Sequence, residues 1–299
     1  MPTAPTAAPL LASAALLLAS AASASVVVPP AGVVVLGPGS FEVQLLASKL
    51  AQQSGHATVQ FIRDDWLTRG NKLMYGPGWK DVVNRVALAS TNSEFGRALQ
   101  AASALVLVAE NGGGTDLKNT LRFAPQVQRV AYLSAIGGSK GTGGELGEAP
   151  RILACEEETR AITAASGVEL SIVRVGPLKG GGASEAGAVG LDAPSFYDTL
   201  RIGGYPTPSW QCAQDYDRMT LGAAVSLGDS VPPRSPGARS AGRSSASPQP
   251  DEISRINAAA ALLACLRQPA PVEVSLSAKA GAVAPTAAEW DAMLAECVA

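Results

Sequence analysis

Short uninterrupted runs of apolar residues alternate along this chain with segments in which apolar residues recur at helical spacing. The first run, Val33–Leu36, stops at Gly37–Ser40, and apolar positions then recur at helical spacing from Phe41 to Leu50. A second run follows at Ala57–Ile62. Such short apolar runs are typical of parallel strands buried on both faces. The pattern therefore predicts a β-α-β unit within Gly32–Asp65, with a tight turn after its first strand.

The same alternation continues toward the C-terminus. The predicted later strands are Val82–Leu88, Ala104–Ala109, Val127–Leu133, Val168–Val175 and Val272–Leu276. The predicted later helices are Ser93–Gln100, Asp116–Phe123, Pro150–Ala165, one capped by Asp251–Ser254 that runs through Leu266, and a last one with a capping box of Thr286 and Glu289. Strands that alternate with helices predict an α/β fold: a Rossmann-type, doubly wound parallel sheet with helices on both faces and a small C-terminal extension on the substrate side.

The turn after the first strand is the predicted binding site for a dinucleotide. Backbone N–H groups at a helix N-terminus lack intrahelical acceptors, and the helix dipole favours an anion there. Gly37 and Gly39 fit the first two glycines of the G-x-G-x-x-G pattern, whereas Glu42 stands at its third position. We expect the amides to face an open crevice; the alternative is that the glycines only permit a tight turn. The predicted contacts here are Gly37, Pro38, Gly39, Ser40 and Phe41.

Two further stretches are predicted to line the cofactor cleft. Arg63 and Asp64 end the second strand, where an acid holds the ribose hydroxyls and an arginine accepts a 2′-phosphate. Arg63 thus favours NADP over NAD, although an exposed ion pair with a neighbouring aspartate explains it equally well. Ala109, Asn111 and Gly112 end the next apolar strand in a glycine-rich loop, and a doubly wound sheet opens toward its ligand at such loops.

Several segments resemble atypical short-chain dehydrogenases/reductases, the NAD(P)-binding group that includes NmrA-like regulators and several plastid proteins. The clearest is ASGVELSIVRVGPLKGG, which is similar to the family's S-G-x-x-(Y/F)-T-I-x-R-x-G-x-L segment. VVVLGPGS with FIRD, LSAIGG and DEISRINAAAALLACL resemble the family at corresponding places, so the resemblance covers about Gly32 to Ala280. It implies a Rossmann fold and a bound NADP, with NAD as the alternative.

The resemblance also implies where catalytic residues would stand. The family generally relies on a Tyr-x-x-x-Lys pair on one helix, and none of the five tyrosines here has a lysine four residues later. The nearest is Tyr197 with Arg201, which follows the sixth strand rather than preceding it. Ser134 matches the family's active-site serine and would bond a substrate carbonyl; alternatively its hydroxyl holds the next loop.

Composition excludes some function classes. A net charge of −2 gives no reason to expect nucleic acid. The four cysteines are scattered without a C-x-x-C pair, and His56 is the sole histidine, so neither a zinc site nor a Ser-His-Asp system is expected. No metal is predicted.

One low-complexity segment is predicted to precede the folded domain, and another is predicted to be a flexible insert within it. Residues 1–31 contain the apolar run Leu10–Ala22 before a small-x-small pattern, which indicates a targeting segment; the alternative is disordered low-complexity sequence. The resemblance to plastid members of the family implies plastid as the address, with the secretory pathway as the alternative. That run is too short to be a membrane span, and the mature domain at 32–299 is not expected to cross a membrane. The stretch at about 231–250 is rich in Pro, Ser, Gly and Arg and predicts a flexible insert.

Two functions remain open from the sequence. One is a non-catalytic or weakly catalytic dinucleotide sensor, scaffold or assembly factor, with a protein partner bound through the 180–250 region. The other is an NADPH-dependent oxidoreductase or epimerase with an unconventional proton donor such as Tyr197. The missing Tyr-Lys pair and Glu42 in the turn favour the first.

Overall fold

The structure is a computed structural model of the chain, and it describes residues 32–61, 87–89, 92–144, 147–179, 222–231, 251–279 and 283–298. Residues 1–31, predicted to be a targeting segment, the 232–250 part of the predicted insert, Arg63, Asp64 and Tyr197 lie outside these residues. The predictions made for them therefore stay predictions.

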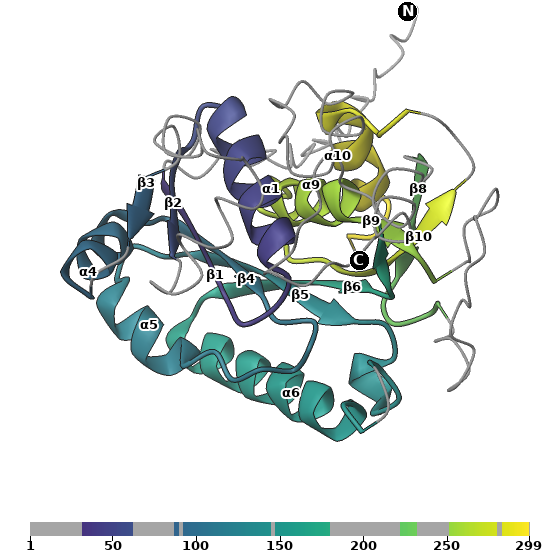
Figure 1. The fold of residues 1–299 in the computed structure, drawn as a ribbon, viewed down its shortest axis with the longest axis horizontal. Coiled ribbons are helices and arrows are strands. Elements are labelled where there is room, and N and C mark those ends of the chain that lie inside the picture. The colour runs from purple at the N-terminus through teal and green to yellow at the C-terminus, as the bar shows by residue number, and fades with distance from the viewer. Residues whose placement is uncertain are drawn as a thin grey trace, which may run out of the picture.

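Strands and helices alternate through the first half of the described chain (Figure 1). These elements are β1 (Gly32–Leu36), α1 (Phe41–Gln53), β2 (Ala57–Phe61), β3 (Ala87–Ala89), α4 (Asn92–Ala101), β4 (Ala104–Val108), α5 (Leu117–Phe123), β5 (Arg129–Ala135), the 3-10 turn η1 (Gly138–Lys140), α6 (Ala149–Ser166) and β6 (Glu169–Val175). The later elements are β7 (Leu178–Lys179), β8 (Gly222–Leu227), β9 (Ile253–Ser254), α9 (Arg255–Cys265), β10 (Glu273–Lys279) and α10 (Ala287–Ala295).

The sheet confirms the predicted fold class. Among the described residues its eight strands have the order β3-β2-β1-β4-β5-β6-β10-β8. All neighbours are parallel except β10 and β8, which pair antiparallel at one edge. The order reverses between β1 and β4, and such a switch point is where doubly wound sheets bind ligands beyond the carboxyl ends of their strands.

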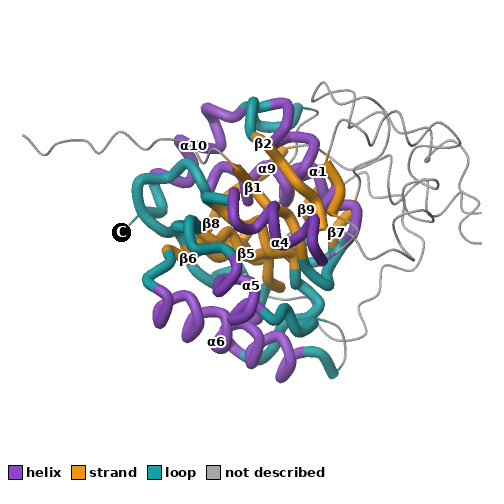
Figure 2. The backbone as a smooth tube through the Cα atoms, turned by 90° about the vertical axis from the view of Figure 1, so that its left-hand side faces the viewer, coloured by secondary structure: helices purple, strands orange, loops and turns teal. Residues whose placement is uncertain are grey.

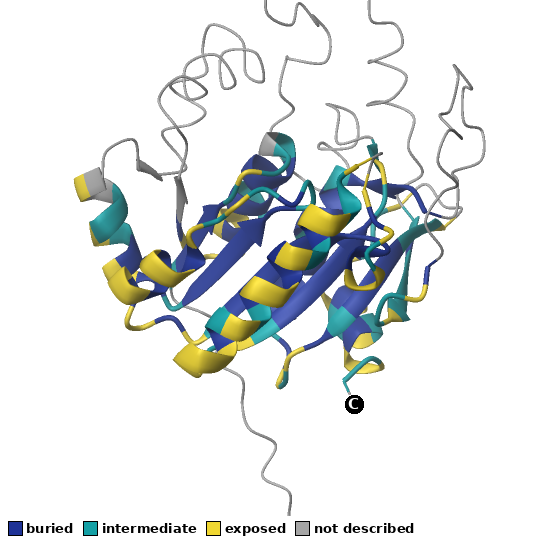
Figure 3. Ribbon diagram, turned by 90° about the horizontal axis from the view of Figure 1, so that it is seen from below, coloured by how far each residue is buried: buried dark blue, intermediate teal, exposed yellow. Residues whose placement is uncertain are grey.

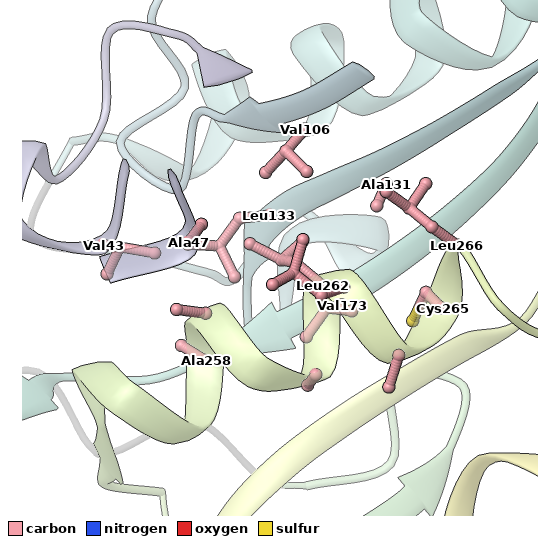
Figure 4. Packing of buried hydrophobic residues seen from close by; sticks show 14 of the residues in the cluster. Val43, Ala47, Val106, Ala131, Leu133, Val173, Ala258, Leu262, Cys265 and Leu266 are labelled. Atoms are coloured by element: carbon pink, nitrogen blue, oxygen red, sulfur yellow. The ribbon is translucent and has the colours of Figure 1, made fainter. Parts of the chain in front are cut away.

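Helices cover both faces of the sheet. In Figure 2 the strands lie between α1, α9 and α10 on one side and α5 and α6 on the other. Figure 4 shows one of these interfaces, where Val43 and Ala47 of α1 approach Leu133 of β5, and Ala258 and Leu262 of α9 lie beneath the same strands. The opposite face is covered by α4, α5 and α6, which expose only their outer sides (Figure 3). A core built largely from Ala, Val and Leu explains why the low aromatic content of 5% suffices.

Most predicted elements are confirmed to within two residues at their ends. α6 begins with Pro150 in its first turn and ends at Gly167, whose φ of 66° is left-handed. Thr286 and Glu289 form the predicted capping box of α10. The prediction of a strand at Val82–Leu88 falls mostly outside the described residues, which contain β3 instead.

The C-terminal part differs from the prediction in its strands. β8 was not predicted, and it extends the main sheet beside β10 rather than standing apart from it. β7 and β9 form a small second sheet just beyond the carboxyl end of β6. No helix in the described ranges is both long and apolar enough to cross a bilayer.

Candidate functional site at the carboxyl edge of the sheet

The turn between β1 and α1 lies at the switch point of the sheet, as predicted. Ser40 caps α1, and its Oγ accepts a hydrogen bond from the Val43 amide at 3.4 Å. The same hydroxyl donates to Oε2 of Glu42 at 2.9 Å. Glu42, at the position of the third motif glycine, therefore places its carboxylate at the N-terminus of α1, where the helix dipole stabilises a negative charge.

Gly37 is required by the neighbouring strand. Its φ is 137°, and a Cβ on it would lie 2.1 Å from the backbone oxygen of Val108. The next glycine is tied to the same atom, because the Gly39 amide donates to the Val108 oxygen at 2.8 Å. The contact between the turn and the end of β4 is thus sufficient to explain Gly37. This agrees with the alternative given above, that the glycines only permit a tight turn.

Glu110, two residues beyond β4, occupies the anion-binding side of this turn. Its Oε1 accepts a hydrogen bond from the Ser40 amide at 2.7 Å. Its Oε2 is buried, without a hydrogen-bond partner, and would lie 2.1 Å from a Cβ on Gly39. In a Rossmann turn the second glycine lets the diphosphate approach the backbone. Here the missing side chain of Gly39 makes room for a carboxylate of the chain itself.

Burial raises the pKa of Glu110 above its ordinary value. The hydrogen bond from the Ser40 amide opposes this effect by stabilising the charged form, as does the positive charge of Arg255. The negative charge of Glu42 raises the pKa further. The hydrogen bond from the Ser40 amide thus partly offsets the cost of burying the charged form of Glu110.

The loop that carries Glu110 is fixed from two sides. Asn111 donates from Nδ2 to the Pro38 oxygen at 2.9 Å, and its Oδ1 accepts from the Gly113 amide at 2.9 Å. On the other side, the Arg151 guanidinium of α6 donates to the Asn111 oxygen at 2.8 and 3.1 Å. The predicted wall of the cleft therefore lies directly on the predicted phosphate turn.

Ser134 belongs to a buried ion-pair network. It is fully buried and lies beside Arg174 in the register of β5 and β6. Its Oγ donates to Oε1 of Glu156 at 2.6 Å, and Glu156 also accepts from Arg174 at 3.0 and 2.7 Å. The hydroxyl proton of Ser134 is thereby committed to a carboxylate of α6 rather than directed toward a ligand.

Acids from three elements surround Arg174, which is 1% exposed. Besides Glu156 these are Glu273 of β10 at 3.4 Å and Asp229, beyond β8, at 3.8 Å. Burial acts to lower the pKa of Arg174, but the three acids outweigh it and the pKa is raised. Arg160, which is 39% exposed, extends the network to the surface by pairing with Glu273.

Asp229 accepts hydrogen bonds from a second group of amides at the same edge. Its Oδ1 accepts from the Gly137 amide at 2.7 Å, and its Oδ2 accepts from the amide and the hydroxyl of Ser139 at 3.2 and 2.8 Å. Lys140 donates to the backbone oxygen of Asp229. The loop after β5 is therefore closed by a carboxylate of the chain, like the turn after β1.

Tyr132 is the one tyrosine in the part of the chain that the structure describes. It is fully buried in β5, and burial together with the nearby Cys155 thiol raises its pKa. A tyrosine that exchanges protons in catalysis needs a lowered pKa instead. Tyr132 is therefore a core residue rather than a replacement for the missing catalytic pair.

The structure thus brings most predicted site residues to one edge of the sheet. The turn and loop residues meet directly, whereas Ser134 faces the helix α6; Phe41 opens α1, and its side chain is not described. These residues are Gly37, Pro38, Gly39, Ser40, Ala109, Asn111, Gly112 and Ser134. The sequence reasoning missed Glu110, Arg174 and Asp229. A charged residue inside the apolar strand 168–175 signals a buried partner, and an acid at the start of the glycine loop signals a group facing the turn.

The residues of the turn do not fit a diphosphate in this arrangement. The carboxylate of Glu110 takes the Ser40 amide and fills the space beside Gly39 that a phosphate would need. The predicted open crevice is closed by Glu110 rather than by Glu42. The side chains of the described residues also contain no cluster suited to a metal ion.

Among known proteins, matches are found in solved structures. No protein-family model matches the sequence, and no curated protein matches it. Yeast methylglyoxal/isovaleraldehyde reductase Gre2 complexed with NADPH is similar over 82% of this chain and 75% of its own, with 9% identity and a TM-score of 0.48. Gre2 from Candida albicans in complex with NADPH has 11% identity and a TM-score of 0.48, over 82% of this chain and 78% of its own.

A solved epimerase structure is also among the matches. UDP-N-acetylglucosamine 4-epimerase from Bacillus cereus matches with 10% identity and a TM-score of 0.44, over 89% of this chain and 82% of its own. The ligands named for these proteins are not assigned to this chain. What the sequence resemblance to atypical short-chain dehydrogenases/reductases predicted for the fold agrees with the observed sheet, and the chain has a Rossmann-type α/β fold.

Proposed function

We propose that this chain is a non-catalytic dinucleotide-binding protein, a sensor or scaffold rather than an oxidoreductase. One observation supports the proposal: the polar side chains Ser134 and Arg174, at the carboxyl ends of β5 and β6, bind a buried carboxylate of the chain itself rather than facing a substrate. Ser134 and Arg174 both bind Glu156, and all three side chains are at most 1% exposed. General acid–base catalysis needs a group within hydrogen-bond reach of the substrate and with a pKa suited to the transfer.

The dinucleotide part of the proposal is supported by position. The turn after β1 stands at the reversal of strand order, opens the helix α1 and faces the glycine loop after β4. The amides of Phe41 and Glu42, as the first residues of α1, have no acceptor within the helix. Because Glu110 holds the neighbouring amide, binding requires a local rearrangement, and a ligand-dependent rearrangement is what a sensor needs.

The test measures binding and turnover separately on the full chain. We expect NADPH or NADH to raise the melting temperature or quench tryptophan fluorescence, and we expect no nucleotide oxidation with a panel of aldehydes and ketones. Gly39→Ala should abolish the response, because the added Cβ would occupy the space beside Gly39 that a phosphate needs and would lie 2.9 Å from the backbone oxygen of Val108. Gly114→Ala is the matched control, since nothing lies within 4 Å of its Cβ position.

Two outcomes contradict the proposal. Absence of any response to either nucleotide removes dinucleotide binding. Steady turnover that is lost in Tyr197→Phe assigns the chain to the oxidoreductase alternative.

A further inference from the structure

The turn after β1 is satisfied by an anion that the chain itself supplies. The Ser40 amide donates to Glu110 at 2.7 Å, a short distance of the kind made to charged acceptors. The second carboxylate oxygen lies against Gly39, where no side chain intervenes. Glu110 thus makes the two contacts that a phosphate makes in such a turn: a backbone N–H bond and a close approach to a glycine.

The second carboxylate oxygen of Glu110 provides independent support for a ligand at this turn. Oε2 of Glu110 is buried and has no hydrogen-bond partner in the described structure. A buried, unpaired carboxylate oxygen is costly, so the carboxylate is held less firmly than a fully bonded one. The backbone beneath it is fixed by Asn111 and Arg151, so the side chain rather than the loop is the part that can move.

We propose that Glu110 is a built-in competitor of the dinucleotide, which binds the turn only by displacing this carboxylate from the Ser40 amide and from Gly39. The inference rests on the proposed function, because it concerns the same site. It identifies the residue that sets the affinity.

The expected effect follows from the bond that the ligand must break. A hydrogen bond to a charged group contributes about 1.5–3 kcal/mol, which corresponds to roughly a 10- to 100-fold change in affinity. Glu110→Gln keeps the shape and removes the charge, whereas Glu110→Ala removes both. We expect NADPH to bind about 10-fold more tightly to Glu110→Gln, and up to about 100-fold more tightly to Glu110→Ala, than to the wild-type chain.

The control removes the same charge elsewhere. Glu157 lies on the exposed side of α6, so Glu157→Gln changes the net charge equally without touching the turn. We expect its affinity for NADPH to equal that of the wild type. Melting temperatures of all three variants without ligand show that each is folded.

Acidity provides a second readout. The groups that face Glu110 are the Ser40 amide, Glu42 of α1 and Arg255 of α9. A protonated Glu110 carries no charge and accepts hydrogen bonds more weakly, so NADPH should bind the wild type more tightly as the pH falls through the raised pKa of Glu110. The ratio of wild-type to Glu110→Gln affinity cancels the titration of the ligand's own phosphates and should approach one.

A third readout needs no nucleotide. The amide proton of Ser40 in NMR spectra should shift as Glu110 titrates, with a midpoint above the value of about 4.3 for a free glutamate. This shift should be absent in Glu110→Gln.

The outcomes separate the two proposals. Equal NADPH affinity of the wild type, Glu110→Gln and Glu110→Ala overturns the competitor role and leaves dinucleotide binding intact. No binding of NADPH or NADH by any of them overturns the proposed function and the inference with it. A pH-independent Ser40 amide shows that the carboxylate does not hold the turn in solution, and also overturns the inference.

Discussion

Removal of the Arg174 side chain tests whether the buried network stabilises the fold. Arg174→Met keeps most of the volume and leaves the buried Glu156 with two remaining partners in the network, the hydroxyl of Ser134 and, at 3.7 Å, the partly exposed Arg160. Arg174 donates two hydrogen bonds to Glu156, at 3.0 and 2.7 Å, and a hydrogen bond to a charged group contributes about 1.5–3 kcal/mol. Two such bonds give roughly 3–6 kcal/mol, which agrees with the loss of about 3–5 kcal/mol expected when a buried pair loses one partner.

Urea denaturation and thermal melting measure this loss. For a domain of this size about 1 kcal/mol lowers the melting temperature by roughly 2–4 °C, so a loss of about 4 kcal/mol lowers it by roughly 8–16 °C. Arg160→Met is the matched control. Arg160 is 39% exposed and pairs with Glu273 and, at 3.7 Å, with Glu156, but solvent screens both pairings, so we expect a loss of about 1 kcal/mol, well below that of Arg174→Met.

The double variant gives the refuting result. The double variant Glu156→Gln/Arg174→Met has no buried unpaired carboxylate at position 156. Its loss of unfolding free energy should therefore be at least about 2 kcal/mol smaller than the sum of the losses of the two single variants. If the coupling energy is below about 0.5 kcal/mol, the two side chains act independently. The interpretation of Ser134 as part of a structural network would then fail as well.

Three further predictions concern packing, thiol chemistry and pH. Gly176→Ala should destabilise the fold by at least about 1–3 kcal/mol in urea, because its Cβ would lie 2.0 Å from the backbone oxygen of Asp251, which no rotamer change relieves. Burial raises the pKa of the Cys265 thiol to about 12, so mass spectrometry should find Cys265 unlabelled by iodoacetamide at pH 8 in the folded chain and labelled in urea; labelling of the folded chain would contradict the burial. The hydrogen bonds from Arg160 lower the pKa of Glu273, so the stability gained from this group is present above the unfolded glutamate pKa of about 4.3 and is lost as the pH falls through the lowered value. Glu273→Gln should therefore lose less stability than the wild type between about pH 5 and pH 3, and equal losses would contradict this assignment.

Local patterns sufficed to predict most elements, because their signals lie within a few residues. The left-handed Gly167 and the capping box of Thr286 are examples, since each depends only on its own helix end. The strand β8 was missed because its position beside β10 depends on pairing across the sheet, which no local pattern encodes.

The candidate site was predicted only in part for the same reason. The backbone positions of the turn and the glycine loop follow from the β-α-β pattern. The direction of a side chain does not, and Glu110 reaches a residue 70 positions earlier while Asp229 reaches one 92 positions earlier. The sequence therefore locates the edge of the sheet at which ligands bind, but it does not show that carboxylates of the chain fill two of its loops.

Those two carboxylates bear on how the protein behaves in ordinary buffers. Amides at the mouth of a Rossmann sheet commonly attract whatever small anion is abundant, such as sulfate or phosphate. In this chain Glu110 and Asp229 already bind them, so inorganic anions find few unoccupied donors there. Purified material should keep the same conformation and melting behaviour when phosphate buffer replaces a zwitterionic one, apart from general salt effects.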